Sequence, residues 1–152
     1  MSAKCRYKNA KAKRERGGFV ALPFAVIRSH SFARLKSHAV KLLCDLLAQY
    51  RGDNNGDLEM TWRTMSKRGW VSRDTLSKAR EELLTANWIV VTRQGGRHQC
   101  SLYAVTFYAI DECRGKLDVN ASAAPSGLWC KNEPPPPPLK VVTRQPCQLP
   151  AD

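Results

Sequence analysis

This sequence has few acidic residues and no long apolar run. Of its 152 residues, 13 are Asp or Glu and 25 are Lys or Arg, which gives a formal net charge of +12. Such an excess favours polyanions, because each phosphate neutralised by Lys or Arg releases condensed counterions, although acidic membranes attract the same charge. No stretch approaches the roughly 18 apolar residues of a spanning helix, and the N-terminus lacks the apolar core of a signal peptide. We therefore expect an intracellular protein with no membrane partner.

Metal-binding and catalytic patterns are also missing. The six cysteines are spaced irregularly with no C-x-x-C pair, which makes zinc a minor alternative to incidental thiols. Cys44 falls within an apolar stretch and is expected to be a small buried residue. His30, His38 and His98 have no nucleophile or carboxylate at a recognisable spacing, and no phosphate-binding glycine loop occurs. We expect no catalytic residues, no metal and no cofactor, and hence a protein that is not an enzyme.

Proline is nearly absent from the first 124 residues and abundant afterwards. Pro23 is the one exception, and a run of five prolines extends from Pro134 to Pro138. Such a run adopts polyproline II and joins neither a helix nor the centre of a sheet. The first 16 residues hold seven basic residues against one acidic residue, a composition too polar to fold alone. The chain is therefore expected to comprise a basic flexible arm (1–17), a folded domain (18–113) and a Pro-rich, extended or disordered tail (114–152) that is a candidate ligand for a protein partner.

The folded domain begins with helical patterns. Ser37 is the predicted N-cap of a helix that runs to Tyr50, because apolar residues recur there at i, i+3, i+4 and i+7 spacing. A turn-rich stretch, 51–57, ends this helix, and residues 58–60 are predicted to form a short strand.

A second group of elements follows this strand. A helix that starts at Trp62 after the cap Thr61, a turn at Gly69 and a second helix capped by Ser72 form a predicted helix-turn-helix. Strands 88–93 and 100–107 then enclose a basic loop, as in a β-hairpin. The order is helix, strand, helix, helix, strand, strand, which predicts a mainly α fold with a small antiparallel sheet (α+β).

The second helix of this unit has one apolar side and one polar side. Its apolar side is formed by Leu76, Ala79, Leu83 and Ala86. The N-terminal residues of such a helix reach base edges in the major groove, and the residues just before the turn can contact the DNA backbone. The alternative is a solvated helix face on which Glu82 pairs with Lys78. The DNA-binding residues expected in this unit are Lys67, Arg68, Ser72, Arg73, Asp74, Ser77 and Lys78.

Two further basic segments are expected to contact DNA. Gly95 and Gly96 are predicted to supply the positive φ angles of a tight hairpin turn, and the turn is flanked by the basic residues Arg93, Arg97 and His98. Such a tip suits phosphate or minor-groove contact. The N-terminal arm, which includes Lys13, Arg14 and Arg16, suits contact with phosphates or an adjacent minor groove, or acts as a localisation signal.

Residues 58–107 resemble the winged helix-turn-helix superfamily of bacterial and phage regulators and replication initiators. Three segments are similar, more narrowly, to uncharacterised bacterial helix-turn-helix proteins that resemble the DNA-binding end of phage or plasmid replication proteins. These segments are Gly18-Phe19-Val20-Ala21-Leu22-Pro23, Asp45-Leu46-Leu47-Ala48-Gln49-Tyr50 and Asn54-Asn55-Gly56-Asp57-Leu58. The turn departs from the usual Gly-hydrophobic-Ser pattern, because both Trp70 and Val71 separate Gly69 from Ser72.

The resemblance implies a non-catalytic protein that binds double-stranded DNA, as a transcription regulator or a replication accessory of a bacterial mobile element. Its expected location is cytoplasmic and nucleoid-associated. The alternative is a module that binds protein or RNA through the winged helix and the tails, because a basic arm does not distinguish RNA from DNA. A homodimer also fits this class, since many winged-helix regulators pair to read two half-sites.

Overall fold

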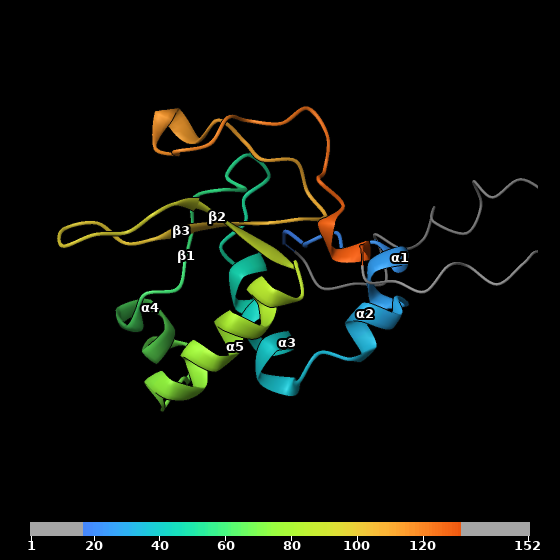
Figure 1. Ribbon diagram of the computed structural model, residues 1–152, viewed down its shortest axis with the longest axis horizontal. Helices are drawn as coiled ribbons and strands as arrows, with labels where there is room; N and C mark the ends of the chain where they lie inside the picture. Colours follow the sequence, from blue (N-terminus) through green and yellow to red (C-terminus); the bar gives the residue numbers. More distant parts are fainter. Residues whose placement is uncertain (1–16, 132–152) are drawn as a thin grey trace, which may run out of the picture.

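The computed structural model describes residues 17–131, which form five α-helices and one three-stranded antiparallel sheet (Figure 1). This confirms the expected α+β class. The elements are, in chain order, α1 (Phe24–Ile27), α2 (His30–Ala33), α3 (Ser37–Leu47), β1 (Leu58–Glu59), α4 (Trp62–Lys67), α5 (Arg73–Thr85), β2 (Ile89–Arg93), β3 (Leu102–Val105) and the 3-10 helices η2 (Cys113–Gly115) and η3 (Leu128–Cys130).

Strand β3 lies at the centre of the sheet, between β1 and β2. All four of its residues are buried, as expected for a strand that is hydrogen-bonded on both edges. The register between β2 and β3 shifts between Val91 and Arg93, so Thr92 is the extra residue of a bulge. The Thr92 hydroxyl is buried and donates to Gly56 O at 2.6 Å, which ties the bulge to the loop before β1.

The hydrophobic core fills the space between the sheet and the helices α3, α4 and α5. Trp88 is completely buried at the start of β2, where its ring stacks on Trp129 with centroids 5.6 Å apart. Trp129 lies within the segment 114–152 that the sequence predicts to be a tail. This segment also pairs with the body through Gly127 N, which donates to Thr106 O at 3.0 Å. Residues 114–131 therefore pack against the domain.

Helix α3 differs in three details from the sequence-based prediction. It ends at Leu47 instead of Tyr50. The N-cap is Lys36 instead of Ser37, and its backbone amide donates to the Glu82 carboxylate at 2.8 Å. A side chain from α5 thus replaces the local cap. Cys44 is exposed, so the prediction of a buried thiol is wrong. It lies about 100° around the helix from the buried Leu43, outside the apolar stripe.

Helices α4 and α5 end in the same way, and each ending directs a tryptophan into the core. Gly69 adopts φ +83° after α4, and Trp70 N then donates to Met65 O at 3.2 Å. At the end of α5, Asn87 adopts φ +60° and precedes the buried Trp88. This is the Schellman ending, in which a left-handed residue satisfies the last carbonyls of the helix.

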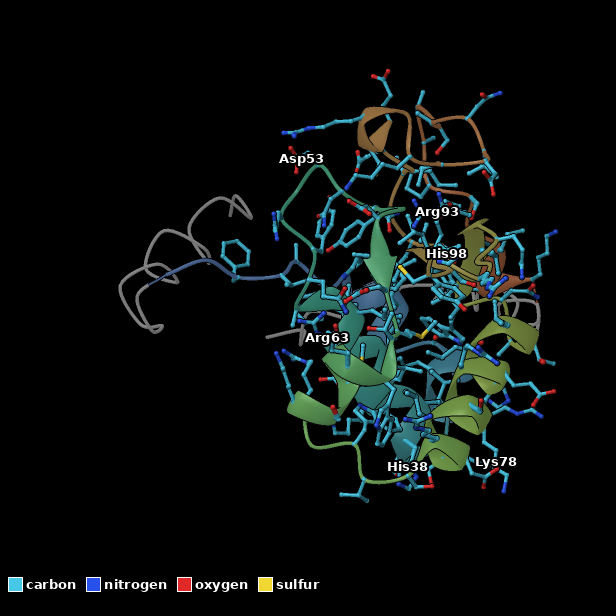
Figure 2. The ribbon with its side chains drawn as sticks, turned by 90° about the vertical axis from the view of Figure 1, so that its left-hand side faces the viewer. His38, Asp53, Arg63, Lys78, Arg93 and His98 are labelled. Atoms are coloured by element: carbon cyan, nitrogen blue, oxygen red, sulfur yellow. The ribbon has the colours of Figure 1, made fainter. Side chains whose placement is uncertain are left out.

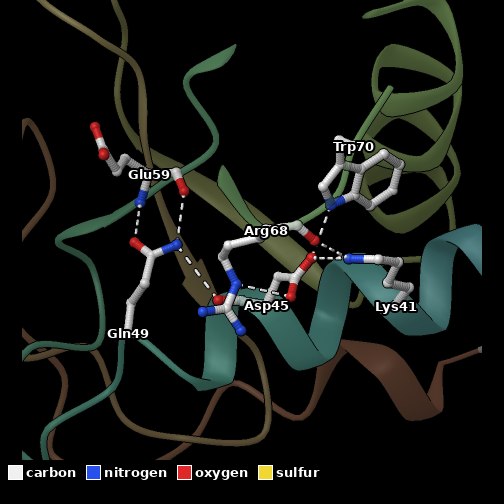
Figure 3. A network of polar contacts seen from close by, with 6 residues as sticks. All are labelled: Lys41, Asp45, Gln49, Glu59, Arg68 and Trp70. Atoms are coloured by element: carbon white, nitrogen blue, oxygen red, sulfur yellow. Dashed lines mark hydrogen bonds and ion pairs between the residues drawn. The ribbon is translucent and has the colours of Figure 1, made fainter. Parts of the chain in front are cut away.

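A buried carboxylate joins α3 to the turn between α4 and α5 (Figure 3). Asp45 is 6% exposed and accepts from the Trp70 indole at 2.7 Å, Arg68 Nε at 2.8 Å and Lys41 Nζ at 2.7 Å. Burial alone would raise the pKa of Asp45, but the hydrogen bonds from Lys41, Trp70 and Arg68 outweigh it and hold this pKa below its ordinary value. The ionised carboxylate therefore fixes the turn.

A second polar contact joins the residue after the C-cap of α3 to the sheet (Figure 3). The Gln49 side-chain amide donates to Glu59 O at 2.9 Å and accepts from Glu59 N at 3.0 Å. It pairs with β1 as a neighbouring strand would. Helix α3 is thus fixed at Gln49 to the sheet and at Asp45 to the helix-turn-helix.

Replacing Asp45 with Asn should lower the free energy of unfolding by about 1–3 kcal/mol, because it leaves buried donors without their charged acceptor. Asp74→Asn is the matched control: it also removes an aspartate paired with a lysine four residues away, but at the surface. Urea denaturation should detect this loss in the first variant and a smaller one, of at most about 1 kcal/mol, in the second, because Asp74 lies in the first turn of α5 near the positive end of the helix dipole. Equal stability of the two variants would contradict the structural role of Asp45.

The contribution of Asp45 should also depend on pH. Because its folded pKa lies below the ordinary 3.8, its stabilisation is fully present above that pH and is lost as the pH falls through the folded pKa. The difference in unfolding free energy between wild type and Asp45→Asn should therefore shrink in acid. Denaturation series from about pH 7 to about pH 2 measure it, and a difference that stays constant over this range would count against an ionised Asp45.

Candidate nucleic-acid interface

The two helices of the helix-turn-helix are capped as the sequence predicts. The Thr61 hydroxyl accepts from Thr64 N at 3.4 Å, and the Ser72 hydroxyl accepts from Thr75 N at 3.3 Å. Ser72 therefore has a structural function at the N-terminus of α5. The turn between the helices comprises residues 68–72, with Trp70 as its buried anchor.

Helix α5 presents two different flanks on either side of its outer ridge. The Arg73 guanidinium lies over the Trp62 ring at 5.2 Å, so this flank faces α4. Glu82 bonds to Lys36 on the opposite flank, which faces the start of α3. Ser77 and Arg80 follow Arg73 at i+4 and i+7 and share the flank that faces α4. All three side chains are exposed.

The outer ridge of α5 is electrically mixed. Asp74 and Lys78 form an ion pair at 2.7 Å, and their side chains are 71% and 74% exposed. The expected alternative pairing of Lys78 with Glu82 is wrong, because Glu82 caps α3 instead. The hydrogen bond with Asp74, together with its negative charge, raises the pKa of Lys78. The Lys78 charge is therefore compensated at close range, and Glu81 adds a further exposed negative charge.

The hairpin tip is a two-residue turn at Arg97 and His98, closed by a bridge between Gly96 and Gln99. Both turn residues are exposed. The prediction of positive φ angles at Gly95 and Gly96 is wrong, because neither glycine adopts one. The turn lies two residues further along the chain than predicted, which places the two basic residues at its apex.

Gly95 is needed for a different reason: the two arms of the hairpin approach each other closely at this position. A Cβ at Gly95 would lie 2.6 Å from Ser101 N and 2.7 Å from Ser101 Oγ. Gly95 N itself donates to Ser101 Oγ at 3.0 Å. The same substitution at Gly96 would meet nothing within 4 Å.

The remaining predicted residues lie in different places. The Arg93 side chain reaches across the hairpin, where Nη2 donates to Cys100 O at 3.1 Å. Arg68 is half-exposed, but its Nε is bound to Asp45. Lys67 is exposed in the last turn of α4. The predicted arm residues Lys13, Arg14 and Arg16 lie outside the described residues.

Two exposed arginines on this side were absent from the sequence-based prediction. Arg63 lies on α4 and Arg80 on the flank of α5 that faces α4. The i, i+7 spacing from Arg73 could have identified Arg80, whereas only the contact between α4 and α5 shows which flank it shares.

We define the basic face by the exposed cations of α4, the α4-facing flank of α5 and the hairpin tip. These elements lie on the left of Figure 1, and Figure 2 looks onto that side, with Arg63 and His98 labelled. Within residues 17–131 none of its five permanent cations is in an ion pair. The five are Arg63, Lys67, Arg73, Arg80 and Arg97.

Two grooves of the described region lack such an excess of charge. The first, of about 1050 Å³, lies between α5 and the α2–α3 region and has three basic and three acidic lining residues besides His38. The second, of about 1260 Å³, lies beside β1 and η2 and has four basic and five acidic lining residues. The basic face differs from both grooves because it contributes five cations and no acidic residue.

Searches for specialised sites and for relatives find none. Residues 17–131 contain no group of three or more His, Cys, Asp or Glu side chains arranged to hold a metal ion. None of the helices within that range has both the length and the apolar character needed to cross a membrane. Comparisons with protein-family models, curated proteins and solved structures give no match for this chain.

Gly95→Ala should destabilise the domain by about 1–3 kcal/mol, because the added methyl group collides with the backbone of the opposite arm of the hairpin. Gly96→Ala is the control, with open space at its Cβ; it should be neutral or stabilising by up to about 1 kcal/mol through reduced freedom of the unfolded chain. Urea denaturation of both variants measures the difference. If Gly95→Ala is as stable as Gly96→Ala, the hairpin does not have this close approach.

Proposed function

We propose that this protein binds double-stranded DNA without catalysis, with α5 in the major groove and the hairpin tip on the phosphate backbone or in the minor groove. The observation that carries the proposal is the basic face, where five exposed cations from three elements lack acidic partners. Phosphates are the ligands that such a surface attracts most strongly, through charge and counterion release.

The arrangement of elements supports a winged helix-turn-helix. The helix-turn-helix α4–α5 is followed directly by the β2–β3 hairpin, and β3 pairs with the β1 strand that precedes α4. In such units the second helix enters the major groove, which is about 12 Å wide and admits one α-helix. The capped N-terminal end of α5 lies on the same side as the hairpin tip (Figure 1).

The α4-facing flank of α5 supplies the contacts in this proposal. Arg73 and Arg80 are separated by seven residues, or about 10 Å along the helix axis. The Arg73 guanidinium lies over the Trp62 ring, with its central carbon 5.2 Å from the ring centroid. This contact restricts the Arg73 side chain before binding, so the side chain loses less conformational freedom when DNA binds. Ser77 lies between the two arginines and can bond to a base or a phosphate. Asp74 and Lys78, paired with each other, add little net charge.

The hairpin tip extends the contact beyond the helix. Arg97 and His98 occupy a turn whose base is fixed by Gly95 and Ser101. A cationic tip of this kind fits phosphates or a narrow minor groove. The biological role that we propose with this activity is regulation of transcription or assistance in replication of a bacterial mobile element, in the cytoplasm.

Replacing Arg73 and Arg80 together with Ala should weaken binding to a random-sequence DNA duplex and lower the slope of log affinity against log salt by about 2, one for each lost phosphate contact. Arg51→Ala/Arg114→Ala is the charge-matched control, because both of its arginines line the second groove. Fluorescence anisotropy with the full chain at several salt concentrations measures both variants.

The same titrations on duplex RNA and single-stranded DNA of equal length test the nucleic-acid class. Tighter binding to duplex DNA than to the other two supports the proposal. Equal loss in the two double variants, or preference for RNA, would contradict it in favour of a non-specific or RNA-binding surface.

A further inference from the structure

Val71 is the most exposed large apolar residue of the described region. Its exposure is 95%, against 66% for Phe19 and 61% for Phe24. It lies in the turn between α4 and α5, directly before the cap of α5. The fold therefore gains almost no burial from this side chain.

The residues on both sides of Val71 are fixed. Trp70 is buried and donates its indole N–H to Asp45 at 2.7 Å. The Ser72 hydroxyl caps α5 through Thr75 N at 3.3 Å. Valine is branched at Cβ and has few rotamers, so its apolar end is held in solvent with little conformational freedom to lose on binding.

The length of the turn explains this position. Trp70 takes the buried place that one hydrophobic residue normally fills between Gly69 and Ser72, and the additional residue, Val71, is directed outward. It protrudes at the N-terminal end of α5, next to Arg73 on the basic face. An exposed apolar group thus lies two residues before Arg73 of the basic face.

We propose that Val71 contacts the C5-methyl group of a thymine in the major groove. That methyl is the apolar group that the base pairs display there, and small apolar side chains recognise it by direct contact. The inference rests on the proposed function, since it needs α5 to lie in the major groove. It assigns a specificity for thymine at one position, in addition to the affinity that the arginines supply.

The test first selects DNA duplexes from a random pool with the full-length protein, and then replaces each thymine of the selected site by uracil, one at a time. Uracil lacks only the C5-methyl group. One replacement should weaken wild-type binding about fourfold, the factor that corresponds to about 0.8 kcal/mol for one buried carbon group. Val71→Ala should bind the thymine duplex about fourfold more weakly and no longer distinguish uracil from thymine at that position.

Val119→Ala is the control, because Val119 is an exposed valine (40%) outside the basic face, in the segment after η2. It should keep the full response to uracil. If no uracil replacement changes the affinity, or if Val71→Ala still responds to it, the thymine contact is overturned while duplex binding, and with it the proposed function, stands. If wild type binds no duplex, the proposed function itself fails.

Discussion

The position of the α4–α5 turn relative to α3 depends on one buried carboxylate. Asp45 comes from α3, yet its oxygens accept from the indole of Trp70 and the guanidinium of Arg68, which belong to the α4–α5 turn. These are charge-assisted bonds in a site sheltered from water, where they are stronger than at the surface. Lys41 completes the charge balance. The start of α5, and every side chain on its exposed flank, is positioned relative to the core through this contact.

The cations that stabilise the fold and the cations of the basic face are different residues in different parts of the domain. Asp45 forms ion pairs with Lys41 and Arg68, whereas Arg73 and Arg80 on α5 have no acidic partner among the described residues. Close ion pairs such as Asp74–Lys78 compensate charge locally, and exposed pairs of this kind contribute little to stability. The basic face stands out because it carries no acidic residue among its cations, whereas acidic and basic residues are mixed in both described grooves.

Sequence reasoning succeeded where structure is decided locally. The caps Thr61 and Ser72 and the three-stranded arrangement followed from short-range patterns of hydroxyl and apolar residues. It failed where a contact with a segment distant in the sequence determines the structure. The partner of Glu82 is the backbone at the start of α3, and the position of the hairpin turn depends on the close approach of Gly95 to Ser101. Periodicity alone also cannot show which flank of α5 faces α4, which is why Arg80 was missed.

The central claim is that the basic face binds duplex DNA, and backbone amide NMR of the full chain, titrated with a short duplex, tests it most directly. The account predicts that the largest shift changes fall within α4, residues 71–80 of α5 and its preceding turn, and the hairpin tip at 96–99. Largest changes at the groove beside β1 and η2, or at α1, would contradict it.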